Sequence, residues 1–312
     1  MSVLPGRAAS WAEQPQEPGP PAEAGAGEGR RAGIGRLFLE TFIQNRLAVL
    51  GVGIVVFFLL FCFVGPLIYH TDQISVNLEQ VSLRPSASHL LGTDETGYDQ
   101  LGRLMVAGRT SLEVGFAAAV VGTTWGALWG AVAGYFGKAI DSILMRAVDS
   151  LLAIPPIFLL LFLATAFTPS VVMLIFVVSL VSWLLPARLV RGETLSLRTR
   201  EFVQAARGVG AKDRRILLRH ILPNAIGPMI VAATFAVADA ILLVAGLSFL
   251  GLGIPPPAAN WGGMLSEGLT YIARGYWWLI YPPGLCIVLV VVAFNFIGDA
   301  LRDALEVRLQ RR

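Results

Sequence analysis

Residues 226–253 read IGPMIVAATFAVADAILLVAGLSFLGLG, an apolar run that contains one charged side chain, Asp239. A helix needs roughly 20 apolar residues to cross a bilayer, and this run exceeds that length. Across the 312 residues, 55% are hydrophobic and 14% are charged, whereas soluble domains average about 25% charged residues. The sequence therefore predicts an all-α polytopic membrane protein.

Five further apolar runs bring the number of predicted membrane spans to six. Thr168 and Pro169 separate the third span from the fourth, which predicts a tight reversal of the chain outside the membrane. Pro155 and Pro156 lie inside the third span and remove backbone donors, so we expect a kink there. The five further runs are residues 47–69, 112–136, 148–167, 170–186 and 283–301.

The basic residues are concentrated in alternate connections. If the N-terminus lies inside, 20 of the 24 Lys and Arg residues fall in inner segments, and Arg84, Arg103, Arg109 and Arg274 fall outside. Because cytoplasmic loops retain positive charge, both termini are predicted to be cytoplasmic. A net charge of only +3 and the lack of a basic patch interleaved with aromatic residues argue against nucleic-acid binding.

Composition divides the chain into segments. Residues 1–36 are rich in Pro, Gly and Ala and cannot bury enough apolar area to offset ordering entropy, so a disordered cytoplasmic tail is expected. This tail lacks the short apolar run of a cleaved signal peptide, so the first span is expected to remain as an anchor. Residues 37–111 hold that span and an external loop. Residues 112–308 form the main transmembrane domain with a cytoplasmic loop at 191–223, and residues 309–312 form a short tail.

The most basic connection contains two short predicted helices. Thr199 is placed to cap the first helix, and Gly208 and Gly210 mark its end. Pro223 stops the second, amphipathic helix just before the fifth span. Such a segment could lie on anionic lipid or, because paired alanines permit close approach, dock into a cleft of another protein. The apolar face of the first helix, at spacing i, i+3, i+4 and i+7, consists of Phe202, Ala205, Ala206 and Val209.

Several motifs together resemble one family. The pattern Gln204-Ala205-Ala206-x-x-x-Gly210, followed by Leu222-Pro223, resembles the EAA loop of bacterial ABC importer permeases, which docks into an ATPase subunit. Together with further motifs, this pattern resembles the second, C-type permease subunit of the oligopeptide, dipeptide and nickel importers over roughly residues 37–308. The further motifs are LGTDETG (91–97), MRAVD (145–149), LSFLGLG (247–253), WG (261–262) and NFIGDALRD (295–303).

This resemblance implies a type I importer permease with a MetI-like core in a bacterial inner membrane. A second homologous permease would complete the pathway, two ATPase subunits would bind the cytoplasmic side, and an external binding protein would deliver substrate. The chain has no Gly-x-x-x-x-Gly-Lys-Ser/Thr loop, so we expect a non-catalytic subunit without a cofactor, with ATP and Mg on the ATPase subunits. The implied docking residues are Glu201, Phe202, Gln204, Ala205, Ala206, Gly208, Gly210, Leu222 and Pro223.

The resemblance favours import of dipeptides or oligopeptides. Nickel import is the alternative within the family, because Val244 stands where peptide-transporting members often have an acidic residue. An ion-coupled secondary transporter is the alternative from another class. That class typically shows internal repeats or several intramembrane carboxylates, whereas only Asp239 is clearly mid-membrane here.

Asp239 is the most costly residue of the predicted spans. Facing lipid would cost about 2.5–3.5 kcal/mol, so its side chain should face the bundle interior or a wet cavity. It could line the transport pathway and attract a substrate ammonium or another cation, or it could contact a polar group such as Thr234. His70, His89 and His220 lack metal-ligand spacing, so no metal site is predicted.

Two other residue groups lead to structural predictions. Cys62 and Cys286 both lie in apolar runs, where small buried thiols are expected rather than a disulfide. Residues 255–281 carry Trp261, Trp277 and Trp278, for which an aromatic belt at the membrane interface is the preferred interpretation. A cap beneath the binding protein is the alternative.

Overall fold

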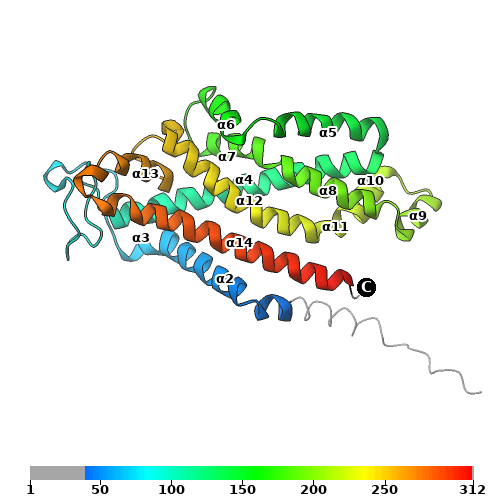
Figure 1. The fold of residues 1–312 in the computed structure, drawn as a ribbon, viewed down its shortest axis with the longest axis horizontal. Helices are drawn as coiled ribbons and strands as arrows, with labels where there is room; N and C mark the ends of the chain where they lie inside the picture. The colour runs from blue at the N-terminus through cyan, green and yellow to red at the C-terminus, as the bar shows by residue number, and fades with distance from the viewer. Residues whose placement is uncertain (1–38, 311–312) are drawn as a thin grey trace, which may run out of the picture.

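The computed structural model describes residues 39–310. The predicted tail of residues 1–36 lies outside the described residues, as do the last two residues of the chain. Within the described residues the chain is helical, and its only β pairing is an isolated bridge between Thr93 and Asp99. The helices run along the long axis of the molecule, with α9 at one end and α13 with an extended loop at the other (Figure 1).

The first span is helical from Arg46 to Ile68. It comprises α2 (Arg46–Leu59), a π turn (Leu60–Val64) and α3 (Gly65–Ile68). The side chain of Asn45 caps it by accepting hydrogen bonds from the first free backbone amides. The predicted first anchor therefore exists with almost the predicted bounds.

The central helix α4 (Gln100–Phe136) begins well before the predicted position 112. Asp99 caps it, accepting a hydrogen bond from the Gly102 amide at 2.9 Å. Hydropathy missed this first part because residues 100–111 include polar side chains such as Gln100 and Arg103, which are buried by other protein segments rather than by lipid. The boundary at residue 112 is therefore wrong for the helix, although it marks where the strongly apolar run begins.

Helix α4 carries glycines at every fourth position where it meets α8 (Leu184–Leu197). A Cβ atom at Gly130 would lie 2.1 Å from the carbonyl oxygen of Ala187, and one at Gly126 would lie 2.4 Å from that of Trp183. Only glycine permits this approach of two helix backbones. Gly134 makes the same close contact with the backbone of α8 one turn further along, so α4 and α8 pack as one unit.

The third and fourth spans are both bent pairs of helices. α5 (Lys138–Leu152) and α6 (Pro156–Thr165) meet at 88°, and α7 (Val171–Ser182) and α8 meet at 43°. The kink predicted from Pro155 and Pro156 is confirmed, and the break is nearly a right angle. The predicted reversal fits the structure, because α6 ends at Thr165, Ser170 caps α7, and the two helices pack against each other.

The remaining spans are α12 (Ile226–Leu247), extended by a π turn to Leu252, and α14 (Tyr281–Gln310). α12 packs against α4 and α14, and α14 packs against α2. Among the described residues, four helices are suited by length and composition to cross a membrane, or up to six if each bent pair is one span. This agrees with the six predicted spans.

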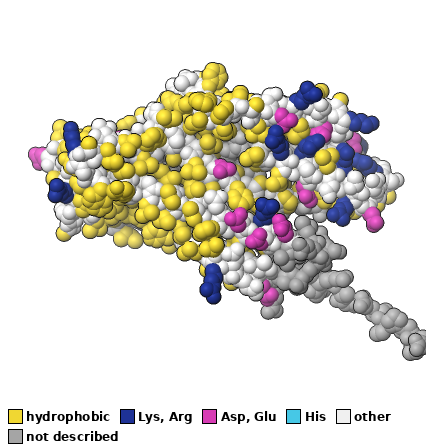
Figure 2. Space-filling view, in the orientation of Figure 1, with side chains coloured by type: hydrophobic (Ala, Val, Ile, Leu, Met, Phe, Trp, Pro, Cys, Tyr) yellow, Lys and Arg dark blue, Asp and Glu magenta, His cyan; other side chains and the backbone are white. Residues whose placement is uncertain are grey.

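The outer surface fits a membrane environment. Hydrophobic side chains cover the middle of the molecule, and Lys and Arg gather at the end that carries α9 (Figure 2). The positive-inside rule assigns that end, hereafter the cytoplasmic end, to the cytoplasm. Helix α2 begins and α14 ends on the same half of the molecule (Figure 1), as expected for two cytoplasmic termini.

Two structural predictions have different outcomes. Cys62 and Cys286 are buried free thiols, as predicted. The aromatic-belt prediction is wrong for Trp261 and Trp278, which are almost fully buried. Their indole nitrogens donate to backbone carbonyls of Leu104 (3.0 Å) and Thr93 (3.2 Å), because buried N–H groups need partners.

Candidate functional site

Helix α9 (Glu201–Gly208) projects at the cytoplasmic end (Figure 1). Arg200 occupies the N-cap position without a side-chain cap, and the Thr199 hydroxyl instead donates to the carbonyl of Ser196 at 2.8 Å. The predicted Thr199 cap is therefore wrong. The helix ends because Gly210 adopts a left-handed backbone (φ 78°), which favours glycine, and its amide donates to the Arg207 carbonyl at 2.9 Å.

The two sides of α9 have different surroundings. Val203 is fully buried in a cluster with residues of α4, α8 and the segment after α9. The predicted apolar face is mostly uncovered, because Phe202 is 40% exposed, Val209 is 85% exposed and Ala205 is also exposed. Ala206 is half-buried beside the cluster. One face thus fixes the helix to its own chain, and the other is left free within the described chain.

Tyr135, at the end of α4, anchors the segment that follows α9. Its hydroxyl donates to the Asp213 carboxylate at 2.5 Å, although the two residues are 78 positions apart. Asp213 begins the short helix α10 (Asp213–Ile216). The Arg207 guanidinium lies 5.1 Å from the centre of the Tyr135 ring, a favourable cation–π distance. No sequence signal identified Tyr135.

Two ion pairs connect α8 to α5. Arg191 binds Asp141 through two hydrogen bonds, of 2.5 and 2.7 Å, and Arg188 binds Asp149 at 2.5 Å. Asp149 is the last residue of the MRAVD motif, so the motif places one of these carboxylates. Because α8 leads directly into α9, the ion pairs link the projecting helix to the bent third span.

The remaining predicted docking residues lie around the same end. Glu201, Gln204, Gly208 and Gly210 are exposed. Leu222 is half-buried against the cluster that holds Val203, whereas Pro223 is exposed, and both lie in the short helix Leu222–Asn224.

Asp239 lines a cavity of about 520 Å³ between α12 and the two bent spans. The walls are largely apolar and include Leu152, Pro156 and Leu184. Within the described part of the chain, the Asp239 carboxylate makes no hydrogen bond or ion pair. Thr234 donates to the carbonyl of Ile230 at 2.9 Å, so it does not serve as the partner considered above.

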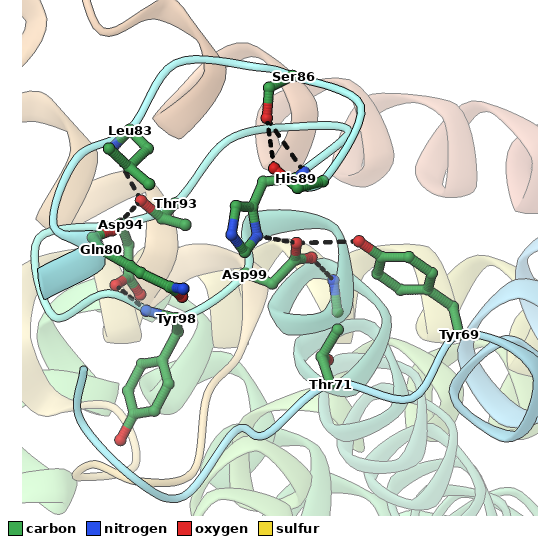
Figure 3. Close-up of polar contacts among 12 residues, drawn as sticks. Tyr69, Thr71, Gln80, Leu83, Ser86, His89, Thr93, Asp94, Tyr98 and Asp99 are labelled. Carbon is green, nitrogen blue, oxygen red and sulfur yellow. Dashed lines mark hydrogen bonds and ion pairs between the residues drawn. The ribbon is translucent and has the colours of Figure 1, made fainter.

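A polar cluster closes the opposite end of the molecule (Figure 3). Its centre is the Asp99 carboxylate, which accepts a hydrogen bond from Tyr69 at 3.0 Å and lies 2.9 Å from Nδ1 of His89. Thr93 donates to the carbonyl of Gln80 and accepts from an amide of the same loop. Burial, and then the neighbouring Asp99, raise the pKa of Tyr69. These contacts hold the external loop on the first turn of α4.

The LGTDETG motif lies in this cluster and has a structural role. Asp94 is buried, pairs with the buried Arg103 at 3.3 Å and accepts an amide hydrogen bond from Tyr98 at 2.9 Å. Glu95 and Glu267 line a small cavity beside the same pair. Burial raises the pKa of both carboxyls. The cavity lies where α13 (Trp261–Leu269) meets α4.

The multi-pass helical bundle with a projecting helix at the cytoplasmic end is the architecture of a polytopic membrane protein. The chain belongs to the family described as binding-protein-dependent transport system inner membrane component, whose model matches residues 126–311. The model described as the N-terminal TM domain of oligopeptide transport permease C matches residues 34–85. The family resemblance proposed from the motifs is confirmed, and a permease subunit of this family is non-catalytic.

Relatives over most of the chain have peptide-transport names. The oligopeptide transport system permease protein OppC of Bacillus subtilis is 37% identical and covers 93% of this chain and 97% of its own length. The dipeptide transport system permease protein DppC of the same species is 39% identical, with coverages of 86% and 84%. An inward-facing structure of the MetNI methionine ABC transporter has a similar fold, with TM-score 0.54, 20% identity, and coverages of 65% of this chain and 96% of that chain. The predicted MetI-like core is thereby confirmed.

Proposed function

We propose that this chain forms the transmembrane pathway of an ATP-driven importer of dipeptides and oligopeptides, together with a second homologous permease. Family membership and the names of the Bacillus subtilis relatives support this assignment. The single observation that carries it is the exposed apolar face of α9, whose other face is fixed to the bundle. An external binding protein would deliver the peptide.

Docking of an ATPase subunit would cover the exposed face of α9. Phe202 and Val209 supply apolar area, and the small side chain of Ala205 between them permits close approach of a cleft. Gly210 sets the direction in which the chain leaves the helix. ATP and Mg²⁺ would bind to the ATPase subunits, and their closure would pull α9 and, through α8, the rest of the bundle.

Asp239 would face the peptide. Its carboxylate lacks a partner in the described chain and lies in an apolar wall, which suits a ligand with one ammonium group and apolar side chains. Both are present in a peptide with a free N-terminus. Val244 is buried in an apolar cluster with Leu160 and Leu174 and does not line the cavity that holds Asp239. An acidic residue at position 244 would therefore lie in this packed cluster and not in the cavity. The sequence reason for nickel import is weakened accordingly.

Charging the exposed face of α9 tests docking. Val209→Asp should abolish co-purification of the ATPase subunits and ATP-driven peptide uptake, because a carboxylate would be desolvated in the interface. Leu78→Asp is the matched control, since Leu78 is equally prominent in the external loop, at 77% exposure, and should leave co-purification intact. Full ATPase retention by Val209→Asp would reject α9 as the docking helix.

The role of Asp239 is tested separately in the reconstituted importer. Asp239→Asn should lower uptake of a peptide with a free N-terminus by about tenfold or more, the value of one charge-assisted contact. Uptake of the N-acetylated peptide should change little. Asp303→Asn makes the same chemical change at an exposed position of α14 and should alter neither rate. Equal loss for both peptides, or no loss, would remove Asp239 from substrate recognition.

A further inference from the structure

A second surface at the cytoplasmic end is not explained by docking of α9. The segment that leads from α9 to α12 borders a shallow hollow of about 600 Å³ that is open to the outside. Its side chains are exposed, and Figure 2 shows Lys and Arg gathered at this end of the molecule. This basic hollow is lined by Lys212, Arg214, Arg215, Leu218, Arg219 and Pro223.

Within the described residues, no other side chain balances the charge of the basic hollow. Within residues 39–306, none of its four cationic side chains takes part in an ion pair or hydrogen bond. The one acidic residue of the segment, Asp213, is turned toward Tyr135, with which it forms the 2.5 Å hydrogen bond. Ile216 and Ile221 on the opposite side are fully buried, so the segment cannot rotate to hide its cations.

The basic hollow has an apolar lip, formed by Leu218, and further exposed apolar residues follow in the chain where α12 begins. Leu218 is 47% exposed, and the next exposed apolar residues are Ile226 and Ile230, on the first turns of α12. Helix α12 is one of the four described helices suited to span a bilayer. The basic hollow therefore directly precedes a helix suited to span a bilayer, the part of the chain where cytoplasmic lipid headgroups are expected.

We propose that the basic hollow binds an anionic phospholipid, with its phosphate among Arg214, Arg215 and Arg219 and an acyl chain along Leu218 and Ile226. Several guanidinium groups suit a phosphate because each donates paired hydrogen bonds. The apolar lip favours a lipid over a free anion. An acidic segment of the ATPase would match the charge, but it would leave Leu218 and the adjoining membrane-facing residues without a complementary surface.

A bound lipid would connect the segment after α9 to the first turn of α12. This contact would form whichever substrate the importer carries. Each cation near an anionic bilayer contributes about fivefold to binding, so removing two should weaken binding about 25-fold. Weaker lipid binding tests the lipid site, whereas loss of ATPase co-purification tests docking of α9.

The test uses the full chain in phosphatidylcholine nanodiscs with a fluorescent phosphatidylglycerol as probe. The wild type should bind the probe, and Arg215→Gln with Arg219→Gln should weaken binding about 25-fold. The control pair Arg84→Gln with Arg274→Gln makes the same change in net charge at the external end and should bind as the wild type does. Equal affinity of the Arg215/Arg219 variant and the wild type would overturn the proposal.

Three further measurements distinguish a lipid site from other anion sites. A photoactivatable phosphatidylglycerol should label peptides within 212–230, and labelling confined to other helices would overturn the site. Soluble glycerophosphoglycerol should not displace the probe at equal concentration, because it lacks the acyl chain; displacement would identify a free-anion site instead. ATPase co-purification should persist in the Arg215/Arg219 variant. If it is lost while probe affinity is unchanged, the hollow binds an acidic protein surface and the lipid assignment is wrong.

Discussion

Tyr135→Phe removes one hydroxyl that connects α4 to the segment behind α9. The ring stays, so packing in the apolar cluster and most of the contact with Arg207 are retained. The change deletes the 2.5 Å hydrogen bond to Asp213. We expect the segment from α9 to α10 to open more often, while the bundle itself remains folded.

The magnitude follows from the surroundings of the two groups. A hydrogen bond to a charged group contributes about 1.5–3 kcal/mol. Asp213 is exposed, so water can replace the lost donor, which moves the expected cost to about 1–2 kcal/mol. At 1.4 kcal/mol per factor of ten, local protection should fall roughly five- to thirtyfold.

Hydrogen–deuterium exchange of the full chain measures this change. Backbone amides of Ala211 and Ile216, which donate to Ala206 and Lys212, report on the segment. Their exchange should accelerate by the stated factor, and exchange in the external loop should not change. Local opening dominates exchange at such sites, so the rate ratio gives the free-energy change directly.

Tyr98→Phe is the matched control. The Tyr98 hydroxyl donates to the carbonyl of Ile74 at 3.0 Å in the external loop, and the residue is as buried as Tyr135. Its loss should accelerate exchange near Ile74 and leave residues 203–221 unchanged. If Tyr135→Phe altered protection of residues 203–221 by less than about twofold, the hydroxyl would not hold the segment and the anchoring argument would fail.

Three further predictions concern the helix contacts. Gly130→Ala should destabilise the chain by about 1–3 kcal/mol, seen as a lower Tm, because the new Cβ meets the backbone of α8; Gly192→Ala, where nothing lies within 4 Å, should not. The double variant Asp141→Arg with Arg191→Asp should have a higher Tm than the sum of the two single changes predicts, with a coupling energy of about 1–2 kcal/mol. Simple additivity would show that the ion pair does not contribute to stability. Burial raises the pKa of Glu267, so its contribution to stability falls as pH rises from the ordinary Glu pKa through that raised value. Glu267→Gln should therefore raise Tm at pH 7 more than at pH 5, and an equal shift at both pH values would contradict this sign.

The six spans could be predicted because a bilayer imposes a minimum apolar length that a single sequence reveals. The end of α9 could also be predicted from Gly208 and Gly210, of which Gly210 adopts the left-handed backbone. The start of α4 could not, because Gln100 and Arg103 are buried by loop residues distant in sequence rather than by their own apolar neighbours.

Only part of the candidate site could be predicted, because some of its contacts depend on tertiary structure. Periodicity correctly identified Phe202, Ala205 and Val209 as one face of α9, but it did not reveal that Val203 on the other side is the packed residue. Both sides of this short helix carry apolar side chains, so spacing alone cannot assign them to a partner or to the bundle. The Tyr135–Asp213 contact depends on tertiary structure and has no local pattern.

Movement of α9 cannot be confined to the cytoplasmic end if α8 behaves as a rigid element. Along α4, the glycine contacts leave little space for α8 to tilt alone, since a Cβ atom at Gly130 would lie only 2.1 Å from the carbonyl oxygen of Ala187. Along α5, Arg188 and Arg191 hold Asp149 and Asp141, so α5 should follow α8. The 88° break after Leu152 separates α5 from α6, and both line the cavity that holds Asp239. A displacement of α9 should therefore change the shape of that cavity, which a spectroscopic distance measured between α5 and α12 with and without ATP can test.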